Sequence, residues 1–245
     1  MSPDSSNDCC DRRDVTAVIL AAGSGTRLGG IAKATLEFRG RTLLHHAIEM
    51  VAPFASEIIV GVRPEDVAWA FEQTAGLDVS ARIRCMAGGA TRQETLHRLI
   101  SQCETRYVLL HEVARPWVQP EEFRHLLLAL RRHSAVALYT PLPVRDGIAL
   151  AKNGRLKATL PRSQVVSVQA PHAYRLSTLV QAYALAEKHG WNEESTTSLM
   201  CRARRRVHLI EGSPHNVKVT YPEDLAPLRA AAVATTNTAI VAARS

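Results

Sequence analysis

Residues 15–36 read VTAVILAAGSGTRLGGIAKATL, in which a short apolar run leads directly into a loop rich in glycine and serine. The run Val15–Leu20 predicts a buried strand. The loop exposes backbone N–H groups with few side chains over them, and such groups bind anions, most often phosphate. Arg27 and Lys33 then supply positive charge just beyond the loop. The stretch therefore predicts an α/β fold with an anion-binding loop after its first strand.

Strand-like and helix-like segments alternate through the first half of the chain. Such alternation predicts βαβ units, and hence a Rossmann-like, mostly parallel sheet with helices on both faces. Ligands of these sheets bind beyond the carboxyl ends of the strands, so the loops there are the expected site. The expected strands are Val15–Leu20, Glu57–Val62, Ile83–Met86, Tyr107–Leu110, Ala135–Tyr139, Val207–Glu211 and Val217–Thr220, and the expected helices include Leu43–Val51, Thr91–Ser101, Leu176–His189 and Ser195–Arg204.

The alternation breaks at Thr140, and no helix is expected from there to Tyr174. Two short runs, Ile148–Ala151 and Leu156–Leu160, flank an Asn-Gly turn and predict a β-hairpin. We expect a projecting β-arm at about residues 141–170, of the kind that often serves dimerisation. The expected organisation is a disordered lead-in (1–13), one domain with the arm (14–232) and a tail (233–245).

The composition of the chain limits the locations and the binding partners that it fits. The chain has 245 residues, 46% hydrophobic, with no apolar run near the roughly 18 residues that span a bilayer. The polar N-terminus resembles neither a signal nor a transit peptide, so a cytoplasmic location without membrane contact is expected.

The net charge of +7 fits binding of nucleic acid or, as we favour, binding of polyanionic small molecules together with a solvated basic surface. The run Arg202–Arg206 lacks interleaved aromatics and is typical of a helix end. Five cysteines without ligand spacing predict no zinc.

Five stretches together resemble one enzyme family. The loop AAGSGTR with a lysine six residues on is similar to the start of nucleotidyltransferases for sugars and polyol phosphates. With the other four stretches, the chain from about Val15 to Leu228 resembles the methylerythritol phosphate cytidylyltransferase family, which includes relatives acting on alditol phosphates and phosphonates. The other stretches are GGATRQETL (88–96), HEVARP (111–116), PVRDGI (143–148) and GSPHNVKVTYPEDL (212–225).

The resemblance implies a nucleotide half. CTP and Mg²⁺ bind, an acceptor phosphate oxygen attacks the α-phosphorus of CTP, and pyrophosphate leaves. Arg27 and Lys33 would neutralise charge at the reacting phosphorus, and Glu112, an aspartate in the family, would lie near the metal and the ribose. Arg92 and Thr95 would support the ribose and its loop. The base and phosphates would lie against small residues, namely Ala21, Ala22, Gly23, Gly25, Gly88 and Gly89.

The resemblance also implies an acceptor site shared across a homodimer. Arg162 on the arm of one subunit would face the acceptor phosphate, together with Lys218 of the other subunit. Arg115 either reaches the acceptor or fixes its own turn. The family has threonine at the positions of Gly147 and Ala170, and each lost hydroxyl costs roughly 1 kcal/mol unless replaced.

Methylerythritol phosphate is thus the expected acceptor, with another alditol phosphate or a small phosphonate as the alternative. Thr159, His172 or Thr196 would be the replacements for the lost hydroxyls. A catalytically inactive nucleotide sensor and a nucleic-acid-binding protein are the remaining alternatives. Neither explains the glycine loop with Arg27, Lys33, Arg162 and Lys218 together.

Overall fold

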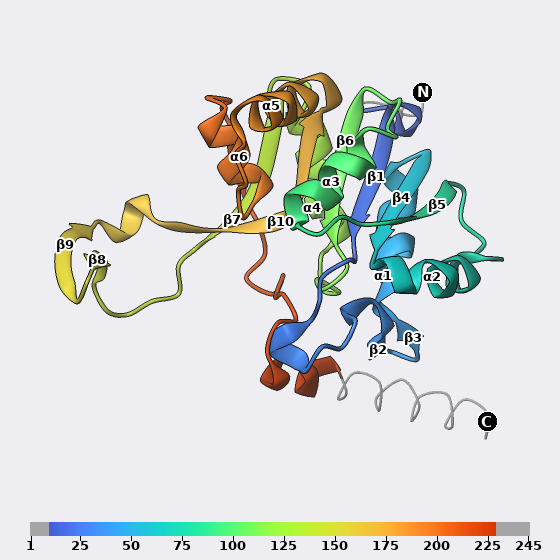
Figure 1. The fold of residues 1–245 in the computed structure, drawn as a ribbon, viewed down its shortest axis with the longest axis horizontal. Coiled ribbons are helices and arrows are strands. Elements are labelled where there is room, and N and C mark those ends of the chain that lie inside the picture. The colour runs from blue at the N-terminus through green and yellow to red at the C-terminus, as the bar shows by residue number, and fades with distance from the viewer. Residues whose placement is uncertain (1–9, 229–245) are drawn as a thin grey trace, which may run out of the picture.

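The computed structural model describes residues 10–228, and its centre is a mixed sheet of seven strands in the order β11-β7-β10-β6-β1-β4-β5 (Figure 1). Four of the six strand pairs in this sheet are parallel, and β10 runs antiparallel to both of its neighbours. The expected mostly parallel α/β fold is confirmed. The strands are β1 (Val15–Leu20), β4 (Glu57–Val62), β5 (Arg82–Ala87), β6 (Tyr107–Glu112), β7 (Ala135–Pro141), β10 (Val166–Arg175) and β11 (His208–Glu211).

Helices cover both faces of the sheet because its central strands are apolar on both sides. Along β1, Ala17 and Ile19 belong to one buried cluster, whereas Val18 belongs to the other. Buried side chains of α1 (Leu43–Val51), α2 (Val67–Thr74) and α4 (Pro120–Ala129) join the first cluster. Those of α3 (Arg92–Ile100), α5 (Leu176–His189) and α6 (Thr196–Arg202) join the second. A strand buried on both faces reads as a continuous apolar run, as residues 15–20 do.

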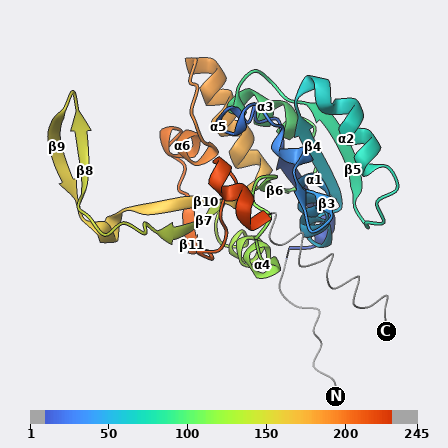
Figure 2. The same ribbon diagram turned by 90° about the horizontal axis from the view of Figure 1, so that it is seen from below.

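The arm between β7 and β10 is a separate two-stranded hairpin of β8 (Ile148–Lys152) and β9 (Arg155–Leu160). Figures 1 and 2 show it standing away from the sheet, and its side chains are almost all exposed. Its turn residues Asn153 and Gly154 have φ of 53° and 70°. Two successive positive φ values match the twist of a hairpin, which explains the Asn-Gly pair.

The structure differs from expectation in two strands. Residues 166–175 form β10, which the sequence pattern does not predict because Pro171 interrupts the alternation. A register shift between Gln169 and His172 admits the proline into a strand with paired neighbours on both sides. The expected strand Val217–Thr220 is wrong: these residues belong to no strand, and the Val219 N–H donates to the Ala114 carbonyl of a loop.

Two small strands, β2 (Glu37–Phe38) and β3 (Arg41–Thr42), were also not predicted, and they pair only with each other. Of the lead-in expected to be disordered, residues 10–13 are described. There Arg12–Asp14 forms a turn of 3₁₀ helix, and the Arg12 guanidinium donates to the Ser80 carbonyl at 2.8 Å. Residues 1–9 and the expected tail, 233–245, lie outside the described residues.

Candidate active site

A cavity of about 470 Å³ lies at the carboxyl ends of β1 and β6, where the sheet topology predicts a ligand site. Its walls come from the loop after β1, the start of α3, the end of β6 and the segment before the last described helical turn. The sequence-predicted residues among its walls are Ala21, Ala22, Gly23, Gly25, Arg27, Lys33, Gly89, Arg92, Thr95, Glu112 and Lys218.

The loop after β1 keeps its shape through Gly25. This glycine has a φ of 60°, and a Cβ built on it would lie 1.9 Å from the Ile31 carbonyl oxygen. Its own carbonyl accepts from the N–H groups of Leu28 and Gly30 at 2.7 and 3.0 Å. Within residues 10–228, the N–H groups of residues 22–24 donate to no acceptor. The loop therefore leaves donors free at the cavity, as an anion-binding loop requires.

The loop between β5 and α3 forms the opposite wall and packs tightly on the first loop. A Cβ at Gly88 would lie 2.7 Å from the Ala22 Cβ and 2.8 Å from the Thr95 Oγ1, so only glycine permits this approach. Gly88 itself does not line the cavity. Gly89 N–H donates to Thr95 Oγ1 at 2.9 Å, and Ala90 N–H donates to Glu94 Oε2 at 2.9 Å. The start of α3 therefore fixes the glycine pair.

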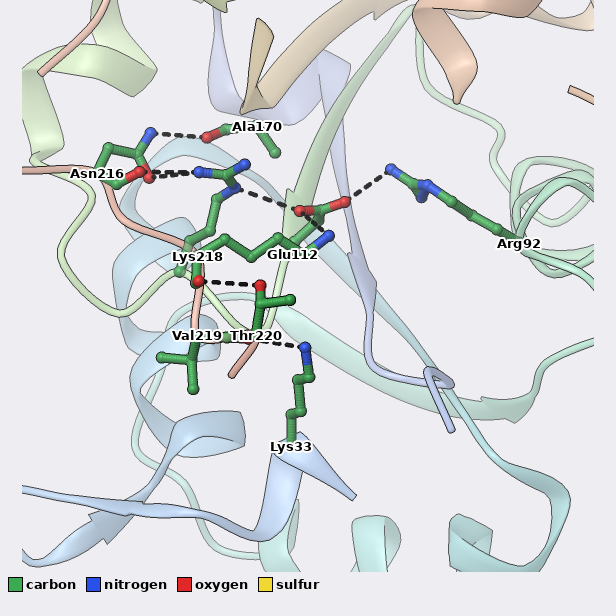
Figure 3. A network of polar contacts seen from close by, with 9 residues as sticks. Lys33, Arg92, Glu112, Ala170, Asn216, Lys218, Val219 and Thr220 are labelled. Atoms are coloured by element: carbon green, nitrogen blue, oxygen red, sulfur yellow. Dashed lines mark hydrogen bonds and ion pairs between the residues drawn. The ribbon is translucent and has the colours of Figure 1, made fainter. Parts of the chain in front are cut away.

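Lys33 enters the cavity from a turn of 3₁₀ helix, and its Nζ donates to the Val219 carbonyl at 2.7 Å (Figure 3). Burial, with the charges of Lys218 and Arg27, lowers the pKa of Lys33 despite the opposing effect of Glu112. The Arg27 guanidinium is more exposed and lies 5.5 Å from the centre of the Tyr221 ring. Two cations thus border one side of the cavity.

Glu112 is the acidic centre of a network shown in Figure 3. Its Oε1 accepts from Arg92 at 2.9 Å, and its Oε2 lies 2.9 Å from Lys218 Nζ and 3.2 Å from Arg115 Nε. Burial alone raises the pKa of this carboxyl, but Lys218, Arg92 and Arg115 outweigh it and hold the pKa well below its ordinary range. Glu112 is therefore ionised and balances only one of three neighbouring positive charges.

Arg115 is buried behind the cavity rather than in its wall. It donates to the Asn216 carbonyl at 2.8 Å as well as to Glu112. This geometry favours the expected alternative in which Arg115 fixes its own turn. Asn216, fully buried, then donates from Nδ2 to the Ala170 carbonyl at 2.8 Å. Asn216 is not predicted from the sequence, because a buried side chain that joins its own loop to Arg115 and to β10 carries no local spacing signal.

Glu112 is not placed to bind a metal directly in this geometry, because cations contact both of its carboxylate oxygens. No other Asp or Glu lines the cavity, and in residues 10–228 no three His, Cys, Asp or Glu side chains gather as a metal site. In this geometry the Glu112 carboxylate is therefore a counter-ion for the cations around it.

Several expected acceptor residues are not brought to the cavity within one chain. Gly147 and Arg162 lie at the base of the arm, and Arg162 donates to the Arg145 carbonyl. Ala170 is buried and contributes its carbonyl rather than its side chain. Of the suggested replacement groups, Thr159 is exposed on the arm, and His172 and Thr196 are buried outside the cavity walls.

Two buried histidines behind the site stay neutral. Burial lowers the pKa of His111 to about 3 and that of His172 to about 4. The His172 Nδ1 lies 3.1 Å from the Tyr174 hydroxyl, whereas neither ring nitrogen of His111 has a partner among the described residues. A neutral imidazole adds no charge to the cluster, so its balance is set by the arginines, the lysines and Glu112.

The fold and the cavity define the class of protein. A mostly parallel sheet, free loop N–H groups at its carboxyl end and a surplus of cations around one carboxylate are the features of a nucleotide-binding α/β protein. In the described part of the chain, no helix is both long and apolar enough to cross a lipid bilayer.

Comparison with known proteins identifies the family. The model of the 2-C-methyl-D-erythritol 4-phosphate cytidylyltransferase family matches residues 15–235. A protein of that name from Deinococcus radiodurans is 36% identical over 212 residues, covering 86% of each chain. Another from Aquifex aeolicus is 32% identical over 210 residues, covering 86% of this chain and 93% of that protein. The crystal structure of the enzyme of that name from Thermus thermophilus has a TM-score of 0.71 at 28% identity, covering 91% of this chain and 99% of that chain.

The chain belongs to the 2-C-methyl-D-erythritol 4-phosphate cytidylyltransferase family. The resemblance expected from the five sequence stretches is confirmed.

Proposed function

We propose that this protein transfers CMP from CTP to the phosphate of 2-C-methyl-D-erythritol 4-phosphate and releases pyrophosphate, a step towards isoprenoid precursors. Family membership gives the reaction class. The observation that carries the proposal is the charge of the cavity: Arg27, Lys33, Arg92 and Lys218 line it with a single carboxylate, Glu112. This surplus suits a triphosphate beside a second phosphate.

The reaction forms one bond and breaks another at the α-phosphorus of CTP. An oxygen of the acceptor phosphate bonds to the α-phosphorus, and the oxygen that bridges the α- and β-phosphates leaves with pyrophosphate. The approach of two anions is the main barrier, so positioning and charge neutralisation supply most of the catalysis. Lys33, held by the Val219 carbonyl, and Arg27 are the groups that neutralise the phosphates.

The two glycine-containing loops hold the nucleotide in this proposal. The free N–H groups of residues 22–24 face the triphosphate, and the close packing of Gly88 on Ala22 leaves a flat wall for the base. Arg92 and Thr95 shape the ribose side. Glu112 orients Arg92 and Lys218 by ion pairing rather than by binding a metal. A divalent cation, which we expect to accompany CTP, would take its ligands from phosphate oxygens and water.

The acceptor site requires a second subunit in this proposal. Arg162 and Gly147 lie on an exposed arm and not in the cavity of their own chain, so the arm would reach the cavity of a partner. Lys218, whose side chain is 41% exposed, would meet the acceptor phosphate from the nucleotide-binding subunit. The expected cytoplasmic location stays a prediction.

The test is pyrophosphate release from CTP and Mg²⁺ with 2-C-methyl-D-erythritol 4-phosphate, compared with a panel of alditol phosphates and small phosphonates. Fast release with the first acceptor is the expected result. Release only with another acceptor would keep the reaction class and change the substrate, as the missing hydroxyls at Gly147 and Ala170 would favour. The absence of release with every acceptor would overturn the proposal.

A further inference from the structure

A second hollow, of about 830 Å³, lies at the opposite end of the sheet from the candidate active site. β7 and β11 pair in parallel with His208 beside Val136, so both strands begin here, whereas the candidate site lies where β1 and β6 end. α4 and α6 also end at this hollow. Four arginines and two histidines line it, namely Arg132, His133, Arg204, Arg205, Arg206 and His208.

Within residues 10–228, the arginines of this hollow have no acidic partners. Among the described residues, no Asp or Glu lines the hollow, and Arg132, Arg204 and Arg206 form no ion pair. The half-buried Arg205 has a buried Nε without a hydrogen-bond partner. By contrast, the nearby Arg202 pairs with Glu193 at 2.5 Å and lies 4.6 Å from the centre of the Trp191 ring. Four arginines therefore line one hollow, and no acidic side chain of residues 10–228 balances their charge there.

Capping of α6 does not explain these side chains. The N–H of Arg204 donates to the Cys201 carbonyl at 2.9 Å, and the N–H of Arg205 donates to the Met200 carbonyl at 2.8 Å. This backbone pattern already satisfies the helix end, and it is usually made with glycine where Arg204 stands with a φ of 54°. The ends of α4 and α6 each carry about half a negative charge, so together they offset about one of the four positive charges.

The two histidines add hydrogen-bond donors to the same space. The rings of His133 and His208 stack with their centroids 3.8 Å apart and their planes 6° apart. Burial, together with the charges of His208 and Arg132, lowers the pKa of His133. An imidazole ring donates from at least one of its two nitrogens. Guanidinium groups bind phosphate oxygens in pairs, so the set suits a ligand with several phosphate oxygens.

We propose that this hollow is a second anion site, separate from the candidate active site, which binds a small oligophosphate such as the di- or triphosphate part of a metabolite. A single phosphate would leave most of the positive charge unbalanced, whereas a triphosphate carries enough negative charge to balance it. The free arginines lie around one hollow of about 830 Å³ beside two stacked rings, and this arrangement favours a small ligand over an extended nucleic-acid backbone. The site rests on the free arginines and does not depend on the proposed reaction.

The test is calorimetric titration with tripolyphosphate at physiological salt, in the full chain carrying Lys33→Ala to weaken the candidate active site. We expect about one tripolyphosphate to bind per chain. Adding Arg204→Ser and Arg206→Ser, both at exposed positions, is expected to weaken binding at least tenfold. The matched control adds Arg82→Ser and Lys188→Ser, which remove the same charge from the opposite edge strand and from α5, and it is expected to change binding less than twofold.

Equal binding by the two double-serine variants would overturn the proposal, as would sulfate binding as tight as tripolyphosphate. Tight binding of single-stranded RNA that tripolyphosphate does not displace would also overturn it, since the surface would then recognise nucleic acid. Pyrophosphate release by the chain with Arg204→Ser and Arg206→Ser alone is expected to equal that of the unmodified protein. This readout separates failure of the second site from failure of the proposed reaction.

Discussion

The proposed site has a nucleotide half and an acceptor half, and a single chain supplies more of the first than of the second. The loops after β1 and β5, with Lys33, Arg92 and Glu112, meet in one cavity. Arg162 and Gly147 stand on an exposed arm that packs against nothing in the described chain. The nucleotide half is therefore held by the core of the sheet, whereas in our proposal the acceptor half depends on a partner subunit.

The largest expected effect is on the nucleotide half. Lys33→Ala should lower kcat by about 10³-fold, because it removes a fixed cation beside the reacting phosphates. The measurement is the rate of pyrophosphate release at saturating CTP and acceptor. Lys188→Ala, at an exposed position of α5, is the matched control and should leave the rate unchanged. Near-normal turnover of the Lys33 variant, with an unchanged melting curve, would remove Lys33 from the mechanism.

The second effect tests whether the acceptor half comes from another subunit. Arg162→Ala should raise the KM for the acceptor by about 10²-fold and leave the KM for CTP nearly unchanged, because a charge-assisted contact to one substrate is lost. The design that sharpens the comparison is a mixture of the Lys33→Ala and Arg162→Ala chains.

If the site is shared, a mixed dimer contains one complete site and one doubly defective site. After unfolding and refolding together, and with the acceptor kept well below the KM of the Arg162→Ala variant, the mixture should recover about one quarter of the unmodified activity, since about half of the dimers are mixed. Each variant refolded alone is the control. Activity of the mixture no greater than the average of its parts, or a fully active monomer by light scattering, would contradict a shared site.

Features set by local sequence could be predicted, whereas features set by contacts between distant segments could not. The glycine loops, Arg27, Lys33 and most of the parallel strands follow from local patterns, and the structure brings these residues together. β10 was missed because Pro171 and a register shift hide its alternation, and tertiary pairing on both sides overrides the local signal. The expected strand at Val217–Thr220 has the right composition but no neighbouring strand to pair with.

The network around Glu112 was beyond sequence reasoning for a related reason. The family resemblance implies that Glu112 of HEVARP lies near a metal. In the structure three cations contact this carboxylate, and two of them, Arg92 and Lys218, come from segments far from HEVARP in the sequence. Their convergence depends on the turn that Arg115 and Asn216 hold, more than a hundred residues apart in sequence. Spacing within a motif reports local geometry, whereas charge balance in a buried cluster is a property of the folded chain.

The third prediction concerns that cluster. Glu112→Gln should lower the free energy of unfolding by about 2 kcal/mol at pH 7, because it leaves Arg92, Arg115 and Lys218 without their shared counter-ion. Urea denaturation measures it. Glu121→Gln is the matched control, since its pair with Arg124 is exposed and worth about 0.5 kcal/mol or less.

The contribution of Glu112 to the free energy of unfolding is expected to depend on pH, in a direction set by the shift of its pKa. The pKa of Glu112 is lower in the folded protein than its ordinary value of 4.5, so its contribution is complete above that value and is lost as the pH falls through the folded pKa. The difference between the unmodified protein and the Glu112→Gln variant should therefore shrink in acid. A difference that does not change between pH 7 and pH 3 would contradict the proposed charge balance.

The smallest expected effect is that of a substitution in the acceptor half, at Gly147. A Cβ built at Gly147 meets nothing within 4 Å, so Gly147→Thr should change the free energy of unfolding by less than about 0.5 kcal/mol. If the acceptor is 2-C-methyl-D-erythritol 4-phosphate, the new hydroxyl should lower the KM for this acceptor by about fivefold through one hydrogen bond, with the KM for CTP as the internal control.

The control variant is Gly154→Thr at the tip of the arm. It is expected to leave both KM values unchanged, although the φ of 70° at Gly154 makes it the more strained substitution. A lower KM only for the Gly147 variant would show that the arm meets the acceptor at its base. Equal KM values in all three proteins would instead mean that the arm recognises the acceptor through Arg162 alone, and the shared half of the site would reduce to one charge.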